Sequence, residues 1–270
     1  MTVINTNIAA LRAAAAGTRN EVDMQTAMQR LSTSKRINSA ADDAAGMAIA
    51  AKMAASIAGY NQGVRNANDG ISLVQTVESD MAAVTGALQR MRVLSVQAYN
   101  GTNGTNDLAS LGTEYVAMLN EITRISGNSA FNGIAMNTTS AVIFAVGSGA
   151  AATDLITLTN QKFDPTTLAL QSTMTTGASA ATAIPLLDAA LATVGTARAN
   201  LGATQNRLQV AVTAAQSNAT NLSAARSRIE DTDYAVETTN LARGQILAQA
   251  GTAMLAQANQ QGQSVLALLK

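Results

Sequence analysis

The stretch INTNIAALRAAAAGTRNEVDMQTAMQRL, residues 4–31, carries apolar side chains at the spacing of a coiled-coil seam. Two positions of the seven-residue repeat hold, in turn, Ile4, Leu11 and Thr18, and Ile8, Ala15 and Val22. A helix with this pattern buries one stripe against another helix. The stretch therefore predicts a helix that pairs with a second helix.

The end of the chain shows a complementary repeat. Large side chains recur at Leu247, Met254 and Leu268, while a second position holds Gly244, Gly251, Ala258 and Val265. Small side chains in a seam let two helix axes approach closely. We therefore expect the two ends of the chain to pair with each other.

The composition argues against several classes of function. The chain of 270 residues has 17 basic and 17 acidic side chains, so it lacks the positive charge that draws proteins to nucleic acid or to an anionic membrane. It contains neither His nor Cys, which removes the usual zinc and haem ligands, disulfides and every triad that uses His. The composition therefore favours a binding or structural role, with no cofactor and no metal.

The uncharged C-terminal stretch is long enough to raise the question of a membrane span. Residues 244–269 carry no charge, and this is longer than the ~20 residues that span a bilayer. The stretch also contains seven Asn and Gln side chains, which are costly to desolvate. We expect no membrane insertion and interpret the stretch as an uncharged amphipathic helix that needs a partner.

The only two prolines, Pro165 and Pro185, predict helical arms on either side of an irregular middle. We expect helices over about 40–100 and 106–127, the first with Ser39 as N-cap and two aspartates in its first turn. Short β-favouring runs at 141–146 and 155–158 predict a hairpin, and 172–183 predicts a loop. Pro185 is expected in the first turn of a helix over about 186–225, with a bend near 231–233.

The predicted fold is mainly α: an elongated bundle of long antiparallel helices with coiled-coil termini and a small β-hairpin region in the middle. Asp42, Asp43 and Asp69 could suggest a catalytic or metal-binding carboxylate group. Neighbouring residues on a helix, however, point about 100° apart, so caps and solvated side chains are the better interpretation.

Several blocks closely resemble bacterial flagellins. RINSAADDAAG at 36–46 is very similar to the N-terminal signature of that family, and NANDGIS at 66–72 fits its next block. On the C-terminal side LGATQNR at 201–207, ARSRIEDTDYA at 225–235 and QAGTAMLAQAN at 249–259 also fit. The resemblance covers about 1–136 and 186–270.

The resemblance implies a structural subunit of the flagellar filament that leaves the bacterium by type III export and polymerises outside the cell through its terminal helices. It implies five segments: inner-tube segments 1–40 and 233–270, helical rod segments 41–136 and 185–232, and a short insert, 137–184. The implied partners are further copies of the chain, an export chaperone, the filament cap and the hook–filament junction proteins. The implied assembly residues are Ile4, Ile8, Leu11, Val22, Leu247, Met254, Leu255, Val265 and Leu268.

The resemblance also suggests an innate-receptor surface, because some flagellins are recognised by Toll-like receptor 5. The matching residues are Leu88, Gln89, Arg90, Leu94, Gln97 and Glu114. Met91 and Val93 depart from the pattern, the latter replacing a usual glutamate, and packing within the filament is an alternative role for the same residues.

Other functions remain open from the residues. A hook–filament junction protein shares the terminal architecture but is not expected to match 36–46 and 201–235 so closely. A protease within the insert is disfavoured by its short length and lack of His. A free-standing adhesin would remain monomeric. The Ser- and Thr-rich segment 138–182 could also carry O-linked sugars.

Overall fold

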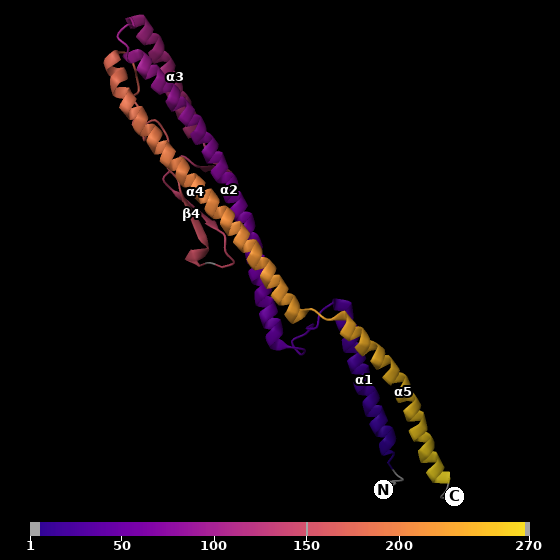
Figure 1. The fold of residues 1–270 in the computed structure, drawn as a ribbon. Helices are drawn as coiled ribbons and strands as arrows, with labels where there is room; N and C mark the ends of the chain where they lie inside the picture. The colour runs from indigo at the N-terminus through magenta and orange to yellow at the C-terminus, as the bar shows by residue number, and fades with distance from the viewer. Residues whose placement is uncertain (1–5, 150, 268–270) are drawn as a thin grey trace. The chain divides into compact units, whose positions relative to one another are not determined.

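The computed structural model describes residues 6–149 and 151–267 and is mainly α (Figure 1). Contacts divide the chain into two units, Met1–Ala55 with Asn221–Lys270, and Ser56–Thr220. The α-helices in the described ranges are α1 (Ile8–Thr33), α2 (Ala44–Tyr99), α3 (Thr105–Asn128), α4 (Gly177–Glu230) and α5 (Tyr234–Ala267). The predicted long helices are confirmed.

The strands form two small antiparallel pairs. β3 (Ala141–Ala145) pairs with β4 (Leu155–Thr159) across a short 3-10 helix (Ala152–Asp154), which confirms the predicted hairpin. β1 (Ala130–Phe131) pairs with β2 (Ile134–Ala135) through Asn132 and Gly133. These two residues have φ values of 48° and 79°, the positive values that a two-residue hairpin turn requires.

The start of α2 differs from the prediction. Asp43, not Ser39, caps this helix, because its side chain accepts a hydrogen bond from the Gly46 amide at 2.8 Å. Ser39 instead lies in the preceding turn, where its amide and hydroxyl both donate to Asp42. An acidic residue next to the helix accepts from the first free amides better than a serine four residues earlier.

The start of α4 is also corrected. The helix begins at Gly177, so the predicted loop over 172–183 ends early and Pro185 lies inside the helix. Thr176 and Ser179 cap each other: each amide donates to the other hydroxyl, at 3.0 and 3.1 Å. This reciprocal cap offsets the hydrogen bond that the proline cannot donate.

The predicted bend near 231–233 is confirmed as a break between α4 and α5. Asp233 starts α5, because its side chain accepts from the Ala235 amide at 2.8 Å.

The second unit buries the main hydrophobic core. Paired contacts show that its helical segments run antiparallel. Arg92 and Glu78 of α2 pair with Asp188 and Arg198 of α4, in reverse order along the two helices. Arg90 of α2 likewise pairs with Glu114 of α3, while Asp80 accepts from Ser129 just after α3. The core includes Met81, Leu88, Met91, Leu94, Tyr115, Ile122, Leu187 and Leu208. Burial raises the pKa of Tyr115 to about 12.

Among the described helices, α4 is long and apolar enough to cross a membrane, judged by length and composition alone. Its apolar residues Leu187, Val194, Leu201 and Leu208 are buried within the second unit. A core helix meets the same criterion, so the finding does not indicate a membrane span.

The β3–β4 hairpin packs on α2 where that helix has no side chains. A Cβ atom added at Gly63 would lie 2.5 Å from the carbonyl oxygen of Val146, and one at Gly59 would lie 2.8 Å from that of Ser148. The Asn66 side chain, which lies between Gly63 and Gly70 on α2, donates to the Ala145 carbonyl at 2.9 Å. Glycines on α2 therefore let the hairpin backbone contact the helix directly.

We expect the substitution Gly63→Ala to destabilise the second unit by about 1–3 kcal/mol. The new methyl group would collide with the Val146 carbonyl, and this backbone cannot shift without moving the hairpin with it. Gly86→Ala on the same helix is the control. An added Cβ there meets nothing within 4 Å, and alanine is favoured over glycine in a helix by up to about 1 kcal/mol. Urea unfolding followed by circular dichroism measures both, and equal effects would contradict the proposed packing of the hairpin.

Candidate assembly surface

Helices α1 and α5 lie side by side in the first unit and run antiparallel (Figure 1). Two side-chain amides join them: Asn7 donates to the Ala258 carbonyl at 2.9 Å and Asn20 to the Gly244 carbonyl at 2.8 Å. The predicted pairing of the two ends of the chain is confirmed for the described residues.

The face of α1 that packs on α5 consists mainly of small side chains. We call this the inner stripe; its members are Ala10, Ala13, Gly17, Asn20, Met24, Ala27 and Leu31, each buried or half-buried. The facing positions on α5 are Glu237, Leu241, Gly244, Ala248, Gly251, Leu255 and Ala258. Both sets alternate steps of three and four residues, as in a coiled coil.

Most of the large residues that the sequence predicts for the seam lie outside it. Ile8, Leu11 and Val22 are 46, 61 and 56 % exposed, and they share the other face of α1 with Ala15 and Thr18. We call these five residues the outer stripe. On α5, Leu247 and Met254 are also exposed, at 51 and 62 %.

Ile8, Leu11 and Val22 therefore do not pair with Leu247 and Met254 within one chain, and contact between subunits remains the predicted role of these residues. Among the predicted large residues that the structure describes, Leu255 alone lies at the seam, together with the predicted small positions Gly244, Gly251 and Ala258. The physical reason is close approach: Gly244 would place a Cβ atom 3.5 Å from that of Met24. Ile4 and Leu268 lie outside the described residues, as does the side chain of Val265.

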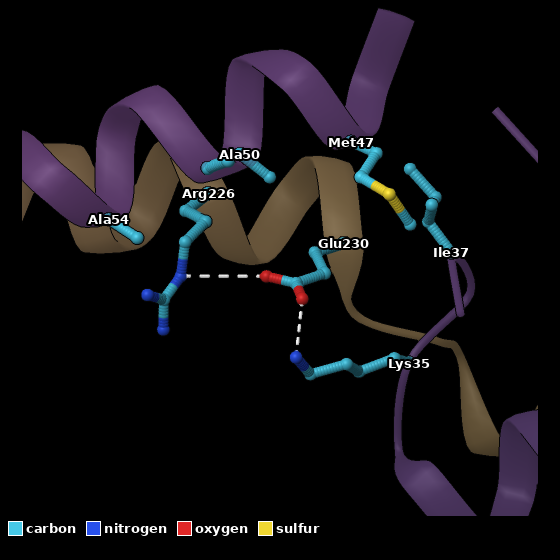
Figure 2. A pocket seen from close by; sticks show the side chains of 8 residues that line it. Lys35, Ile37, Met47, Ala50, Ala54, Arg226 and Glu230 are labelled. Carbon is cyan, nitrogen blue, oxygen red and sulfur yellow. Dashed lines mark ion pairs between the residues drawn. The ribbon is translucent and has the colours of Figure 1, made fainter. Parts of the chain in front are cut away.

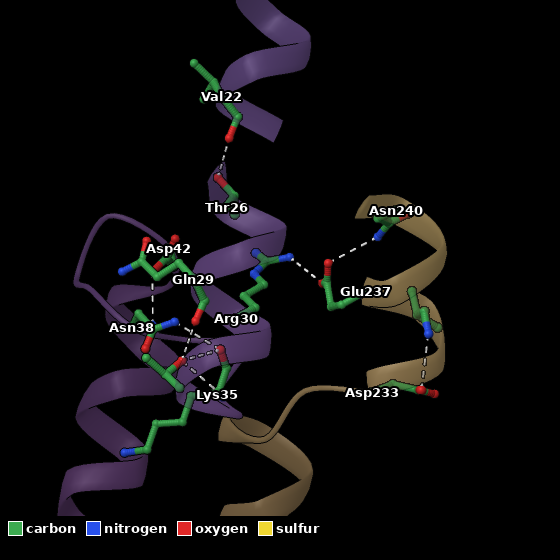
Figure 3. A network of polar contacts seen from close by, with 12 residues as sticks. Val22, Thr26, Gln29, Arg30, Lys35, Asn38, Asp42, Asp233, Glu237 and Asn240 are labelled. Atoms are coloured by element: carbon green, nitrogen blue, oxygen red, sulfur yellow. Dashed lines mark hydrogen bonds and ion pairs between the residues drawn. The ribbon is translucent and has the colours of Figure 1, made fainter. Parts of the chain in front are cut away.

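Polar contacts close the seam near the start of α5 (Figure 3). Arg30 Nη1 lies 3.0 Å from Glu237 Oε1, and Asn240 donates to the other carboxylate oxygen at 3.3 Å. The Glu237 side chain is only 8 % exposed, so its charge depends on Arg30 for compensation. A polar groove of about 380 Å³ runs beside this pair, with Asp23 and Arg243 in its lining.

The segments that lead away from α1 and into α5 bind each other. The Arg36 amide donates to the Glu230 carbonyl at 2.7 Å, and the Thr232 amide donates to the Ser34 carbonyl at 3.2 Å. Ser34 itself has a φ of 60° at the end of α1. Hydrogen bonds from the Ser39 and Asn38 amides lower the pKa of Asp42, so this carboxylate stays charged and fixes the turn.

A cavity of about 220 Å³ lies at this junction in the first unit (Figure 2). Its polar side is one ion-pair group: Glu230 lies 2.5 Å from Lys35 Nζ and 3.6 Å from Arg226 Nε. Its other side is apolar and formed by Ile37, Met47, Ala50, Ala51 and Ala54. Both cations contact the same carboxylate, and the arrangement contains no nucleophile with an adjacent base. Among the residues that the structure describes, no group of His, Cys, Asp or Glu could hold a metal ion.

The residues of the suggested receptor surface fall into an exposed group and a buried group. Gln89, Arg90 and Gln97 are exposed on α2, and Arg90 forms an ion pair of 2.6 Å with the partly exposed Glu114. Leu88 and Leu94 are fully buried in the core of the second unit. These two leucines can support the surface from beneath but cannot contact a partner of the folded chain.

The inner stripe is the feature that sequence reasoning missed. Its signal was present, because Ala10, Ala13, Gly17 and Asn20 already follow the three-and-four spacing. The larger side chains of the outer stripe have the same period, and their size makes them the better seam by pattern alone. A repeat gives the spacing of a seam but not which of two stripes faces the neighbouring helix of the same chain.

Comparison with known proteins places this arrangement in a family. The profile of the bacterial flagellin N-terminal helical region matches residues 4–138, and that of the bacterial flagellin C-terminal helical region matches residues 184–269. Flagellin from Halalkalibacterium halodurans is 43 % identical, over 99 % of this chain and all of its own. The flagellar filament 33 kDa core protein of Treponema phagedenis is 38 % identical over similar shares.

A solved structure agrees with these relatives. The crystal structure of Bacillus cereus flagellin is 32 % identical and aligns with a TM-score of 0.52, covering 60 % of this chain and 94 % of that one. The chain belongs to the bacterial flagellin family, whose members are the structural subunits of the flagellar filament.

Proposed function

We propose that the chain polymerises through the outer stripe of α1 and the exposed apolar residues of α5, each packing against further copies of the same chain. The observation that carries this proposal is the exposure of Ile8, Leu11 and Val22 on a helix whose other face is already paired. Full burial of a large apolar side chain contributes about 1.5–3 kcal/mol. A filament would recover that energy at every subunit.

The charge distribution supports the same proposal. Between Gly244 and Ala267, α5 carries no charged residue, so further copies can approach it without desolvating ions. The charged residues Arg30 and Glu237 compensate each other within one chain. We propose that Val265, Ile4 and Leu268 extend the same assembly surface.

We expect Leu11→Gln and Val22→Gln each to raise the monomer concentration needed for polymerisation by about tenfold or more, since each removes apolar burial of the order given above. Leu11→Met and Val22→Ile, which stay apolar, are the matched controls and should polymerise normally. Sedimentation after addition of ammonium sulfate, which strengthens apolar burial, measures the assembled fraction. Circular dichroism checks that all four variants fold, and normal polymerisation of the folded glutamine variants would contradict the proposal.

We further propose that this filament subunit is exported and extracellular, that it binds an export chaperone, the filament cap and the hook–filament junction proteins, and that it has no enzymatic activity. The hook–filament junction protein is the alternative role. A filament subunit is present in many copies and a junction protein in few, so quantitative mass spectrometry of isolated flagella separates the two.

Receptor activity is proposed for the exposed part of the α2 surface, which is Gln89, Arg90 and Gln97 with Glu114 of α3. It is supported by their match to receptor-binding flagellins and by the ion pair that fixes Arg90 against Glu114.

We expect monomer to activate reporter cells that express Toll-like receptor 5, and Arg90→Ala to reduce the response, because loss of one anchoring residue in an interface can cost much of the affinity. Arg124→Ala, which removes an exposed ion pair on α3, is the control. Absence of any response at high dose would contradict the receptor proposal without affecting the assembly proposal.

A further inference from the structure

The chain contains three Asn-Gly pairs, at 100–101, 103–104 and 132–133. This dipeptide has an intrinsic chemical weakness. Glycine has no Cβ to shield its amide nitrogen, so this nitrogen can reach the side-chain carbonyl carbon of the asparagine before it. The three pairs differ in how strongly the structure restrains them.

Two of the pairs are held in place. The Asn103 carboxamide donates to the Gln97 and Asn100 carbonyls at 2.6 and 3.1 Å, and the Gly104 amide donates to Asp107 Oδ2 at 3.0 Å. In the third pair, Asn132 and Gly133 form the tight turn between β1 and β2, and rotation of that backbone breaks the pairing of Phe131 with Ile134.

The first pair, between α2 and α3, is held through its main chain alone: the Asn100 amide donates to the Gln97 carbonyl at 3.2 Å, and the Asn100 carbonyl accepts from Asn103. Asn100 is exposed and directly follows the last residue of α2. Within the described part of the chain, neither its carboxamide nor the Gly101 amide makes a hydrogen bond. A Cβ atom added at Gly101 would meet nothing within 4 Å, so the dipeptide has room to change conformation.

We propose that Asn100 is a site of spontaneous deamidation in the folded protein. The Gly101 nitrogen, after losing its proton to hydroxide, attacks the Asn100 side-chain carbonyl carbon. The bond from that carbon to the side-chain nitrogen breaks and ammonia leaves, which forms a five-membered succinimide. Water then opens the ring at one of its two carbonyls and gives either aspartate or isoaspartate.

Both products change the junction between the two helices. Each adds a negative charge beside the C-terminus of α2, where the helix dipole already places negative potential. Isoaspartate also lengthens the main chain by one methylene group. The Asn100 carbonyl, which accepts from the amide and the carboxamide of Asn103, would then be displaced.

The experiment compares the folded and unfolded chain. Purified full-length monomer is incubated in mildly alkaline buffer with and without denaturant, and peptide mass spectrometry measures conversion at each asparagine. In the folded chain we expect Asn100 to convert at least about tenfold faster than Asn103 or Asn132, since each of those must first give up hydrogen bonds or strand pairing. In denaturant the three rates should approach one another. Equal rates in the folded chain, or Asn100 the slowest, would overturn the proposal.

Two variants test the chemistry itself. Gly101→Ala shields the attacking nitrogen, and the open space at this position allows the fold to accept the methyl group. It should slow conversion at Asn100, whereas Asn103→Gln should leave that site reactive. Labelling by an isoaspartyl methyltransferase identifies the isoaspartate product. Unchanged conversion in Gly101→Ala would show that attack by the following nitrogen is not the route and would overturn the mechanism.

Discussion

The close approach of α1 and α5 is the constraint on which the first unit depends. Asn20 reaches the Gly244 carbonyl because that residue has no side chain in the way, and the same contact brings Met24 against the glycine. A seam built this way favours small residues, which make up most of the inner stripe, and it accommodates Met24 because Gly244 lies opposite it. Ile8, Leu11 and Val22 lie on the outer face of α1, the surface that we propose further copies cover.

The two units differ in how far they bury their apolar residues. The second unit buries Leu88, Met91, Leu94 and Tyr115 almost completely within one chain, and its hairpin covers part of α2 directly. In the part of the first unit whose burial the structure describes, few large side chains are buried, and α1 and α5 are joined by amide-to-carbonyl bonds and by the Arg30–Glu237 ion pair. A subunit whose core is complete in one part and incomplete in the other is suited to polymerisation, since folding and assembly then use separate surfaces.

Much of this fold was predictable from local signals. The absence of proline from 1–164 and 186–270 predicted the long helices, and the β-favouring runs predicted the β3–β4 hairpin. Pro185 misled the prediction for α4, because the cap at Thr176 and Ser179 allows the helix to start earlier than its proline suggests. The orientation of α1 was not predictable from its period, since the inner and outer stripes repeat alike. The fit of Gly244 against Met24 and the Asn20 bond to the Gly244 carbonyl distinguish them.

The orientation of α1 is tested most directly by disulfide formation, because the natural chain has no cysteine. Met24→Cys with Gly244→Cys places two Cβ atoms 3.5 Å apart, within the range of about 3.5–4.5 Å that a disulfide accepts. Our account predicts that this pair cross-links within the monomer under mild oxidation, and that Val22→Cys with Gly244→Cys does not. Cross-linking of the second pair in preference to the first would show that the outer stripe faces α5 and would contradict the account.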